Sequence, residues 1–115
     1  MAADCIFCNI VAGKIPSQKI FENDSVIGFK DLRPQASLHH LFIHKKHSKD
    51  VAELMKHDPS QVSDLFTAMT SYSENEGLNV KGYRIVTNLG SLAGQTVFHT
   101  HFHLLSGEPL SGFGA

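Results

Sequence analysis

"AGQTVFHTHFHLLSG", residues 93–107, places three of the eight histidines of the chain at alternate positions in an apolar run. A period of two is typical of a β-strand, because successive side chains on a strand point to opposite faces. We therefore expect His99, His101 and His103 to share one face, with neighbours about 6.5–7 Å apart. The opposite face of the strand is expected to pack on helices through Phe98, Phe102 and Leu104.

Three interpretations of this histidine row are open. It could be the polar surface of an exposed strand. It could bind a metal, although the outer two imidazoles lie too far apart to share one ion at bonds of about 2 Å. It could also act on phosphorus, since a neutral imidazole is a good nucleophile near neutral pH and its neighbours can stabilise charge on phosphate oxygens. The third interpretation uses all three histidines.

Composition limits the class of protein. The 115 residues are 42% hydrophobic, which is typical of one globular domain, here 1–115. The formal net charge of -1 indicates neither a nucleic-acid-binding surface nor a membrane-binding one. The N-terminus lacks the pattern of a signal peptide and no run approaches the ~18 apolar residues of a membrane span, so we expect a cytoplasmic protein.

Periodicity and turn residues predict an α+β fold with a mostly antiparallel sheet. Helices are expected at 4–14 and 48–55, with a longer one opened by Asp58 as N-cap and Pro59 in the first turn. Strands are expected at 19–24, 25–31, 38–45, 83–88 and 96–105. The long helix carries an apolar stripe expected to face the core: Val62, Leu65, Phe66, Met69 and Tyr72.

The two cysteines, Cys5 and Cys8, have the spacing of half a tetrahedral metal site. In a reducing compartment such a pair is more often a metal half-site or redox pair than a disulfide. The alternative is two small buried cysteines. "HKKH", residues 44–47, and the histidine row supply further candidate ligands.

"QTVFHTHFHLL", residues 95–105, resembles the signature of the histidine triad (HIT) family, in which three histidines alternate with apolar residues. Thr100 departs from the signature because it is polar. Residues 15–47 and "KGYRIVTN", residues 81–88, resemble the Hint branch of the family, the purine nucleoside phosphoramidases. This resemblance implies the HIT-like fold, a roughly five-stranded antiparallel sheet with a long central helix and a short N-terminal helix.

The resemblance also implies roles for individual residues. His101 matches the position that attacks the α-phosphorus, His103 one near a phosphate oxygen, and His39 one in a proton relay on the leaving-group side. His40 is adjacent, and a register slip by one residue would exchange the faces of the two. Asp31 matches the position that binds the ribose hydroxyls. Positions that contact phosphate or the leaving group correspond to Asn88, Gln95 and Thr96, and positions that line the base pocket correspond to Phe7, Ile10, Phe29 and Leu32.

No cofactor is implied for catalysis. Some bacterial relatives hold a structural zinc, and that set corresponds here to Cys5, Cys8, His47 and His99. Most relatives have proline where this chain has His44, which leaves His44 as a competing ligand.

The expected activity is cleavage of a nucleoside 5′-phosphoramidate to the monophosphate through a nucleotidyl-histidine. A dinucleoside polyphosphate hydrolase of the fragile-histidine-triad type is the alternative enzyme, and it usually continues further beyond its histidines. A nucleotide-binding scaffold without turnover is the alternative outside the enzymes. We also expect a homodimer, formed through part of the apolar stripe of the long helix and the edge strand "GYRIVT", residues 82–87, with Phe113 reaching towards the partner's site.

Overall fold

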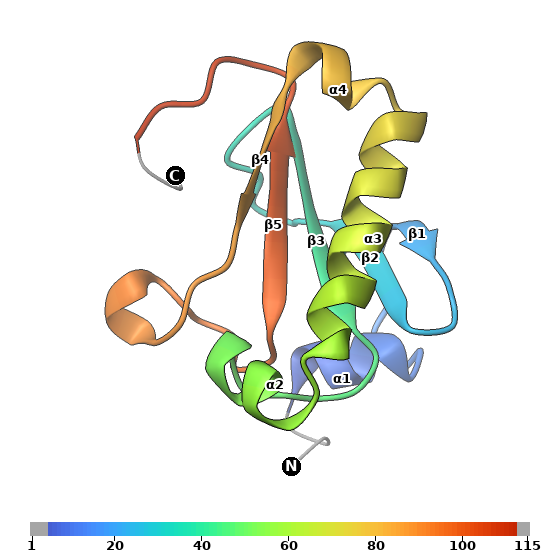
Figure 1. Ribbon diagram of the computed structural model, residues 1–115, viewed down its shortest axis with the longest axis vertical. Coiled ribbons are helices and arrows are strands. Elements are labelled where there is room, and N and C mark those ends of the chain that lie inside the picture. Colours follow the sequence, from blue (N-terminus) through green and yellow to red (C-terminus); the bar gives the residue numbers. More distant parts are fainter. Residues whose placement is uncertain (1–4, 113–115) are drawn as a thin grey trace.

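The computed structural model of the protein describes residues 5–112 (Figure 1). In chain order its elements are α1 (Ile6–Val11), β1 (Lys19–Glu22), β2 (Val26–Lys30), β3 (Leu38–His44), α2 (Val51–His57), α3 (Ser60–Asn75), α4 (Leu78–Lys81), β4 (Tyr83–Val86), the 3₁₀ turn η2 (Ser91–Ala93) and β5 (His101–Ser106). None of the helices in this described part is long and apolar enough to cross a membrane. Phe113 lies outside the described residues.

The strands form one antiparallel sheet in the order β1-β2-β3-β5-β4. The predicted α+β class with a five-stranded antiparallel sheet is therefore confirmed. The two histidine-bearing strands, β3 and β5, are neighbours at the centre, with His40 opposite Leu104 and Leu41 opposite His103. This pairing joins two segments that are far apart in the sequence.

Local signals account for most element boundaries. The side chain of Asn23 accepts the N–H groups of Ser25 and Val26, and this turn joins β1 to β2. Asp50 caps α2 by accepting the N–H of Glu53 at 2.9 Å. Before α3, the Asp58 carboxylate accepts the hydroxyl of Ser60, while Pro59 already has helical dihedral angles. The predicted start of the long helix is thus confirmed to within one residue.

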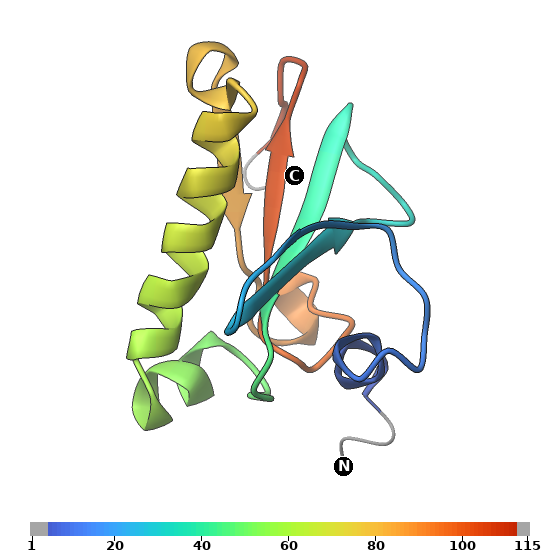
Figure 2. The same ribbon diagram turned by 90° about the vertical axis from the view of Figure 1, so that its right-hand side faces the viewer.

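Helices lie on the two faces of the sheet. Figure 2 shows α3 running along one face and α1 on the other side. The larger core lies under α3 and contains Phe42, Leu65, Met69 and Phe102. A second, smaller core lies on the α1 side and contains Phe7, Ile27, Phe29, Leu41 and Ile43. The histidines of the candidate site belong to this second face.

The last strand differs from the prediction. It begins at His101 and not near Thr96, so His99 does not share a strand face with His101 and His103. Just before the strand, the N–H of Thr100 donates to the carbonyl of Ser48 at 2.7 Å, and their two hydroxyls lie 2.7 Å apart. These bonds tie the chain to the turn after β3 instead of to a neighbouring strand. Phe98 is 47% exposed and so lies outside the buried core.

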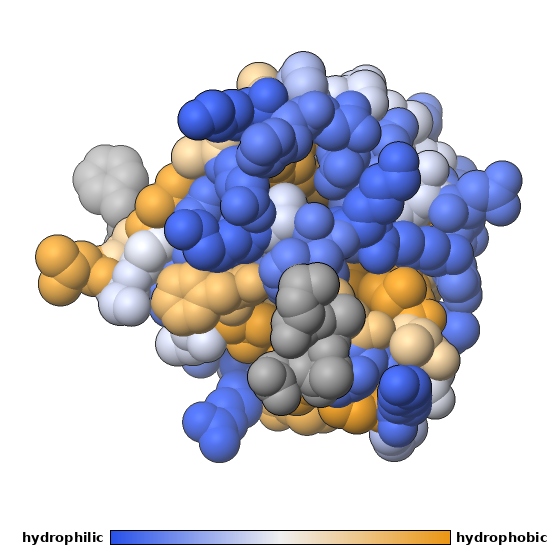
Figure 3. All heavy atoms as spheres, turned by 90° about the horizontal axis from the view of Figure 1, so that it is seen from below, coloured by the Kyte–Doolittle hydropathy of each residue, from blue (hydrophilic) through white to orange (hydrophobic). Residues whose placement is uncertain are grey.

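The stripe on α3 is only partly buried. Leu65 and Met69 are completely buried, whereas Phe66 is 40% exposed. Seen from below, the surface of the molecule as a whole shows apolar patches among polar ones (Figure 3). The long helix therefore covers the sheet with one side and exposes part of its apolar stripe.

Candidate functional site

The ring of His101 is buried and held by one backbone contact. Its Nδ1 donates to the carbonyl of His99 at 2.8 Å. The proton of the neutral ring is then on Nδ1, which leaves the lone pair on Nε2. Burial lowers the pKa of His101, although the bond to His99 acts in the opposite direction. His101 is therefore neutral near pH 7, with a nucleophilic Nε2.

A second chain of contacts fixes the protons of His39 and His103. The N–H of Gln35 donates to Nδ1 of His39 at 2.9 Å, so His39 carries its proton on Nε2. That Nε2 donates a hydrogen bond to Nδ1 of His103 at 2.9 Å and lies 3.4 Å from a carboxylate oxygen of Asp31. His103 consequently carries its own proton on Nε2 and can donate it to a ligand.

The rings of His39 and His103 both stay neutral near pH 7. Burial lowers the pKa of His39, and the negative charge of Asp31 only partly offsets the effect. Burial, together with the neighbouring His101 and His39, lowers the pKa of His103 to about 4. The His103 ring centroid is 5.1 Å from that of His101, so the two rings are neighbours.

The donor atoms of Asp31, His39 and His103 lie within 4.8 Å of one another, which is also close enough for a metal site. The Gln35 N–H argues against that use, because it keeps the proton of His39 on Nε2, the nitrogen that a metal would need. These three residues are therefore better arranged to form a hydrogen-bonded proton relay than to bind a metal ion.

The remaining predicted substrate residues have varied surroundings. Phe7 and Phe29 are buried with ring centroids 5.5 Å apart, and Phe7 also packs edge-on against His101 at 5.1 Å. Ile10 is half-buried beside the same cluster. Leu32 is 92% exposed, so it is not part of the core, and its contact with a base stays a prediction.

The predicted phosphate-side residues lie in the segment between β4 and β5. Asn88 is half-buried and Thr96 is exposed. Gln95 is buried: its amide donates to the carbonyls of Lys49 and Val97 and accepts the N–H of Gly90. Gln95 therefore holds the loop together, and any contact with a ligand would compete with one of these bonds.

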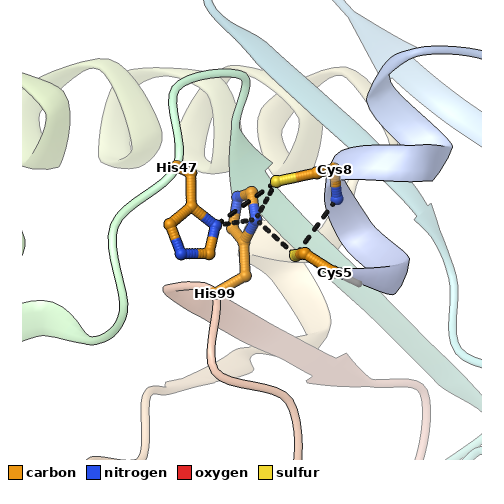
Figure 4. A group of neighbouring side chains, drawn as sticks. All are labelled: Cys5, Cys8, His47 and His99. Atoms are coloured by element: carbon orange, nitrogen blue, oxygen red, sulfur yellow. Dashed lines mark hydrogen bonds between the residues drawn. The ribbon is translucent and has the colours of Figure 1, made fainter. Parts of the chain in front are cut away.

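The four predicted metal ligands come together at one point (Figure 4). Cys5 directly precedes α1 and Cys8 lies on it. His47 lies in the turn after β3, and His99 lies in the segment before β5. Nδ1 of His99 lies 3.3 Å from Cys5 Sγ, 3.5 Å from Cys8 Sγ and 3.2 Å from Nδ1 of His47. Donor atoms around a tetrahedral zinc are separated by about 3.3–3.8 Å, given its usual bond lengths.

The protonation of this cluster also suits a cation. Nε2 of His99 donates to the carbonyl of His44, so the lone pair of His99 is on Nδ1, towards the two sulfurs. Burial and the adjacent Cys5 raise the pKa of Cys8 to about 11, so a divalent cation is what would favour its thiolate. The side chain of His44 instead pairs with Asp64 on α3 at 3.0 Å and stays outside the four-residue cluster.

Two residues that hold the site, Gln35 and Ser48, carry no signal in the sequence. Gln35 acts through its backbone N–H, and Ser48 acts as the partner of Thr100. Asp31, expected to bind the ribose, also lies next to His39. His40, the alternative to His39, faces α3 and contacts the Tyr72 hydroxyl at 3.0 Å. None of these pairings follows from spacing along the chain.

The fold and the site together define a histidine-triad type of protein: an antiparallel sheet whose central strands bring the neutral His101 next to the hydrogen-bonded pair His39 and His103. Residues 12–110 match the HIT domain, and the chain belongs to the HIT family.

Similar proteins include the purine nucleoside phosphoramidase of Escherichia coli K12, 34% identical over 96% of this chain and 92% of that protein. A HIT-like protein of Helicobacter pylori is 37% identical over 90% of this chain and 96% of its own. Among solved structures, a histidine triad protein from Clostridium difficile has a TM-score of 0.91 at 37% identity, with 96% of both chains covered. A HIT family hydrolase from Clostridium thermocellum has a TM-score of 0.89 at 39% identity, also with 96% of both chains covered. These similarities support a hydrolase.

Proposed function

We propose that the protein hydrolyses nucleoside 5′-phosphoramidates to nucleoside monophosphates through a nucleotidyl intermediate on His101. The observation that carries this proposal is the bond from Nδ1 of His101 to the His99 carbonyl, which leaves Nε2 free to attack. The E. coli relative named a purine nucleoside phosphoramidase supports the choice of substrate.

In the first step, Nε2 of His101 forms a bond to the α-phosphorus while the P–N bond breaks, and the leaving amine takes a proton from the solvent. In the second step, water attacks the phosphorus and gives up a proton to the solvent, the bond to Nε2 breaks, and the monophosphate and a neutral His101 ring are released. The Nε2–H of His103 donates to a phosphate oxygen as charge develops there. The negative charge of Asp31 favours a charged His101 ring, so it stabilises the positive charge that develops on this ring when its Nε2 bonds to phosphorus.

Hydrolysis of an adenosine 5′-phosphoramidate, compared with that of diadenosine triphosphate, tests the proposal. We expect faster hydrolysis of the phosphoramidate and, on quenching, a mass increase of one nucleoside monophosphate on the chain. A preference for diadenosine triphosphate would indicate the dinucleoside polyphosphate hydrolase. Binding of the monophosphate without turnover of either compound would indicate a nucleotide-binding scaffold.

A variant of the nucleophile sharpens this test. His101→Asn should lose more than ~10³-fold in turnover, as expected for a covalent nucleophile, yet still bind the monophosphate. His57→Asn changes an exposed histidine at the end of α2 and serves as the matched control. If His101→Asn keeps more than about a tenth of the activity, the covalent mechanism is wrong.

We further propose that Cys5, Cys8, His47 and His99 hold a structural zinc. The donor distances and the tautomer of His99 support this assignment. When bound, zinc would neutralise the two thiolates and fasten α1 to the segment before β5. Because His99 also accepts the bond from His101, and Phe7 of α1 packs on the same ring, these residues would keep the nucleophile in position.

A further inference from the structure

Glu108 lies outside the reacting groups but holds a loop that ends at them. One of its carboxylate oxygens accepts both the N–H of Ser37, at 2.7 Å, and the hydroxyl of Ser37, at 2.6 Å. Glu108 follows β5 and Ser37 precedes β3, just beyond the last pair of the ladder, Leu38 with Ser106. The contact therefore closes the end of the two strands that carry the histidines.

The backbone around this contact is closely packed. Gly107 has φ of +93°, in the region that favours glycine, and turns the chain after β5 towards Ser37. A Cβ at Gly107 would lie 2.9 Å from Cβ of Ser37. The short approach between the two segments thus depends on glycine at this position, and it brings Glu108 over the end of the loop at residues 31–37.

This loop determines where the proton of His39 is. Its Gln35 N–H donates to Nδ1 of His39, which keeps the His39 proton on Nε2 and directs it towards His103. If Gln35 moved away, Nδ1 of His39 could take the proton instead. His103 would then have to donate from Nδ1, and its Nε2 would present a lone pair to the substrate in place of a proton.

The other end of the loop is held separately. The carboxylate of Asp31 accepts a hydrogen bond from the backbone N–H of Arg33 at 2.8 Å. The backbone N–H of Asp31 donates to the carbonyl of His39 at 3.0 Å. Ser37 lies two residues from Gln35 on one side and two from His39 on the other. Its bonds to Glu108 therefore hold the loop on the side that Asp31 does not.

We propose that Glu108 is a positioning residue: by holding Ser37, it keeps the Gln35 N–H on Nδ1 of His39 and so maintains the proton donor on His103. This inference rests on the proposed function for its kinetic consequence, but not for its effect on the His39 tautomer. The bonds from Ser37 lower the pKa of Glu108, so the carboxylate is charged at neutral pH.

The consequence for the rate follows from the population of the competent tautomer. If loss of the bonds between Glu108 and Ser37 reduces that population to between a third and a tenth, kcat falls by roughly 3- to 10-fold. KM should change by less than about twofold, because Glu108 contacts no residue assigned to the base or the ribose. Ser37→Ala, which keeps the backbone N–H but removes the hydroxyl, should have a smaller effect, and Ser37→Thr should preserve the rate.

The experiment combines kinetics with nitrogen NMR of the histidine rings in the full chain. In the unchanged protein, His39 should show a protonated Nε2 and an unprotonated Nδ1, and Glu108→Ala should introduce the Nδ1-protonated form together with the fall in kcat. Glu22→Ala removes another exposed carboxylate, one that pairs with Lys19 and Lys45 on the β1 side. This control should change neither kcat nor the His39 tautomer.

An unaltered His39 tautomer in Glu108→Ala overturns the proposal, whatever happens to the rate. An equal change in Glu22→Ala also overturns it, because the effect would then be one of general charge. If the unchanged protein hydrolyses neither substrate, the proposed function fails while the tautomer measurement still decides the role of Glu108.

Discussion

Thr100, the polar residue in the otherwise apolar signature, provides a test of how the segment before β5 is held. Its side chain is 2% exposed, and its hydroxyl lies 2.7 Å from that of Ser48, which is also buried. Thr100→Val has nearly the same shape but leaves the Ser48 hydroxyl without this partner. An unsatisfied buried hydroxyl costs about 1–3 kcal/mol, so we expect the free energy of unfolding to fall by about 2 kcal/mol.

Urea unfolding of a double-mutant cycle measures this effect. Ser48→Ala alone should cost less, because the Thr100 hydroxyl can still donate to the carbonyl of residue 48 at 3.3 Å. In Thr100→Val/Ser48→Ala both partners are absent, and we expect about 1 kcal/mol of the loss to be recovered. Thr70→Val is the control, since the hydroxyl of Thr70 lies on the exposed side of α3. Additive single effects, or a loss below about 0.5 kcal/mol in Thr100→Val, would refute this reasoning.

Three further measurements test the protonation, the metal and the assembly. Because burial lowers the pKa of His103 from 6.5 to about 4, the unfolded chain binds this proton at a higher pH than the folded chain does. His103 by itself should therefore lower the free energy of unfolding by at most about 2 kcal/mol between pH 7 and pH 5 in urea titrations. A slope unchanged in His103→Gln would contradict this. Protein purified without chelators should contain about one zinc per chain; Cys5→Ser or Cys8→Ser should lose it and lower the melting temperature, and fully stable, active protein without zinc would disprove the site. We propose that β4, at the edge of the sheet, and α3, with Phe66 40% exposed, form a homodimer interface. Light scattering at micromolar concentration should give twice the 12.6 kDa chain mass and a lower value for Phe66→Glu, whereas 12.6 kDa for the unchanged protein would exclude the dimer.

The predicted fold class and the approximate positions of the first four strands agree with the structure because alternating and helical patterns are local. The exception is instructive. The apolar run before His101 has the period of a strand, but Thr100 bonds to Ser48 and not to a neighbouring strand. Whether an extended segment pairs in a sheet depends on what lies beside it, and the sequence pattern does not contain that information.

For the candidate metal ligands, too, the sequence indicated some of the residues and the tertiary structure decided among the others. Cys-x-x-Cys spacing indicates a half-site, and the resemblance supplied His47 and His99 as its partners. The structure brings these four residues together and turns His44 towards Asp64. Spacing alone left His44 and His47 as equal candidates, because both belong to the same short turn and only the direction of each side chain separates them.

By itself the sequence determined which chemical groups are available: three closely spaced histidines, two cysteines and the alternating pattern that makes an antiparallel sheet. Tertiary structure decided which nitrogen of each ring carries the proton. The carbonyl of His99 places it on Nδ1 of His101, whereas the N–H of Gln35 places it on Nε2 of His39. The two tautomers of a neutral imidazole differ little in energy, so a single backbone partner is enough to select one. Because that partner is a backbone group positioned by the fold, no residue type in the sequence specifies it.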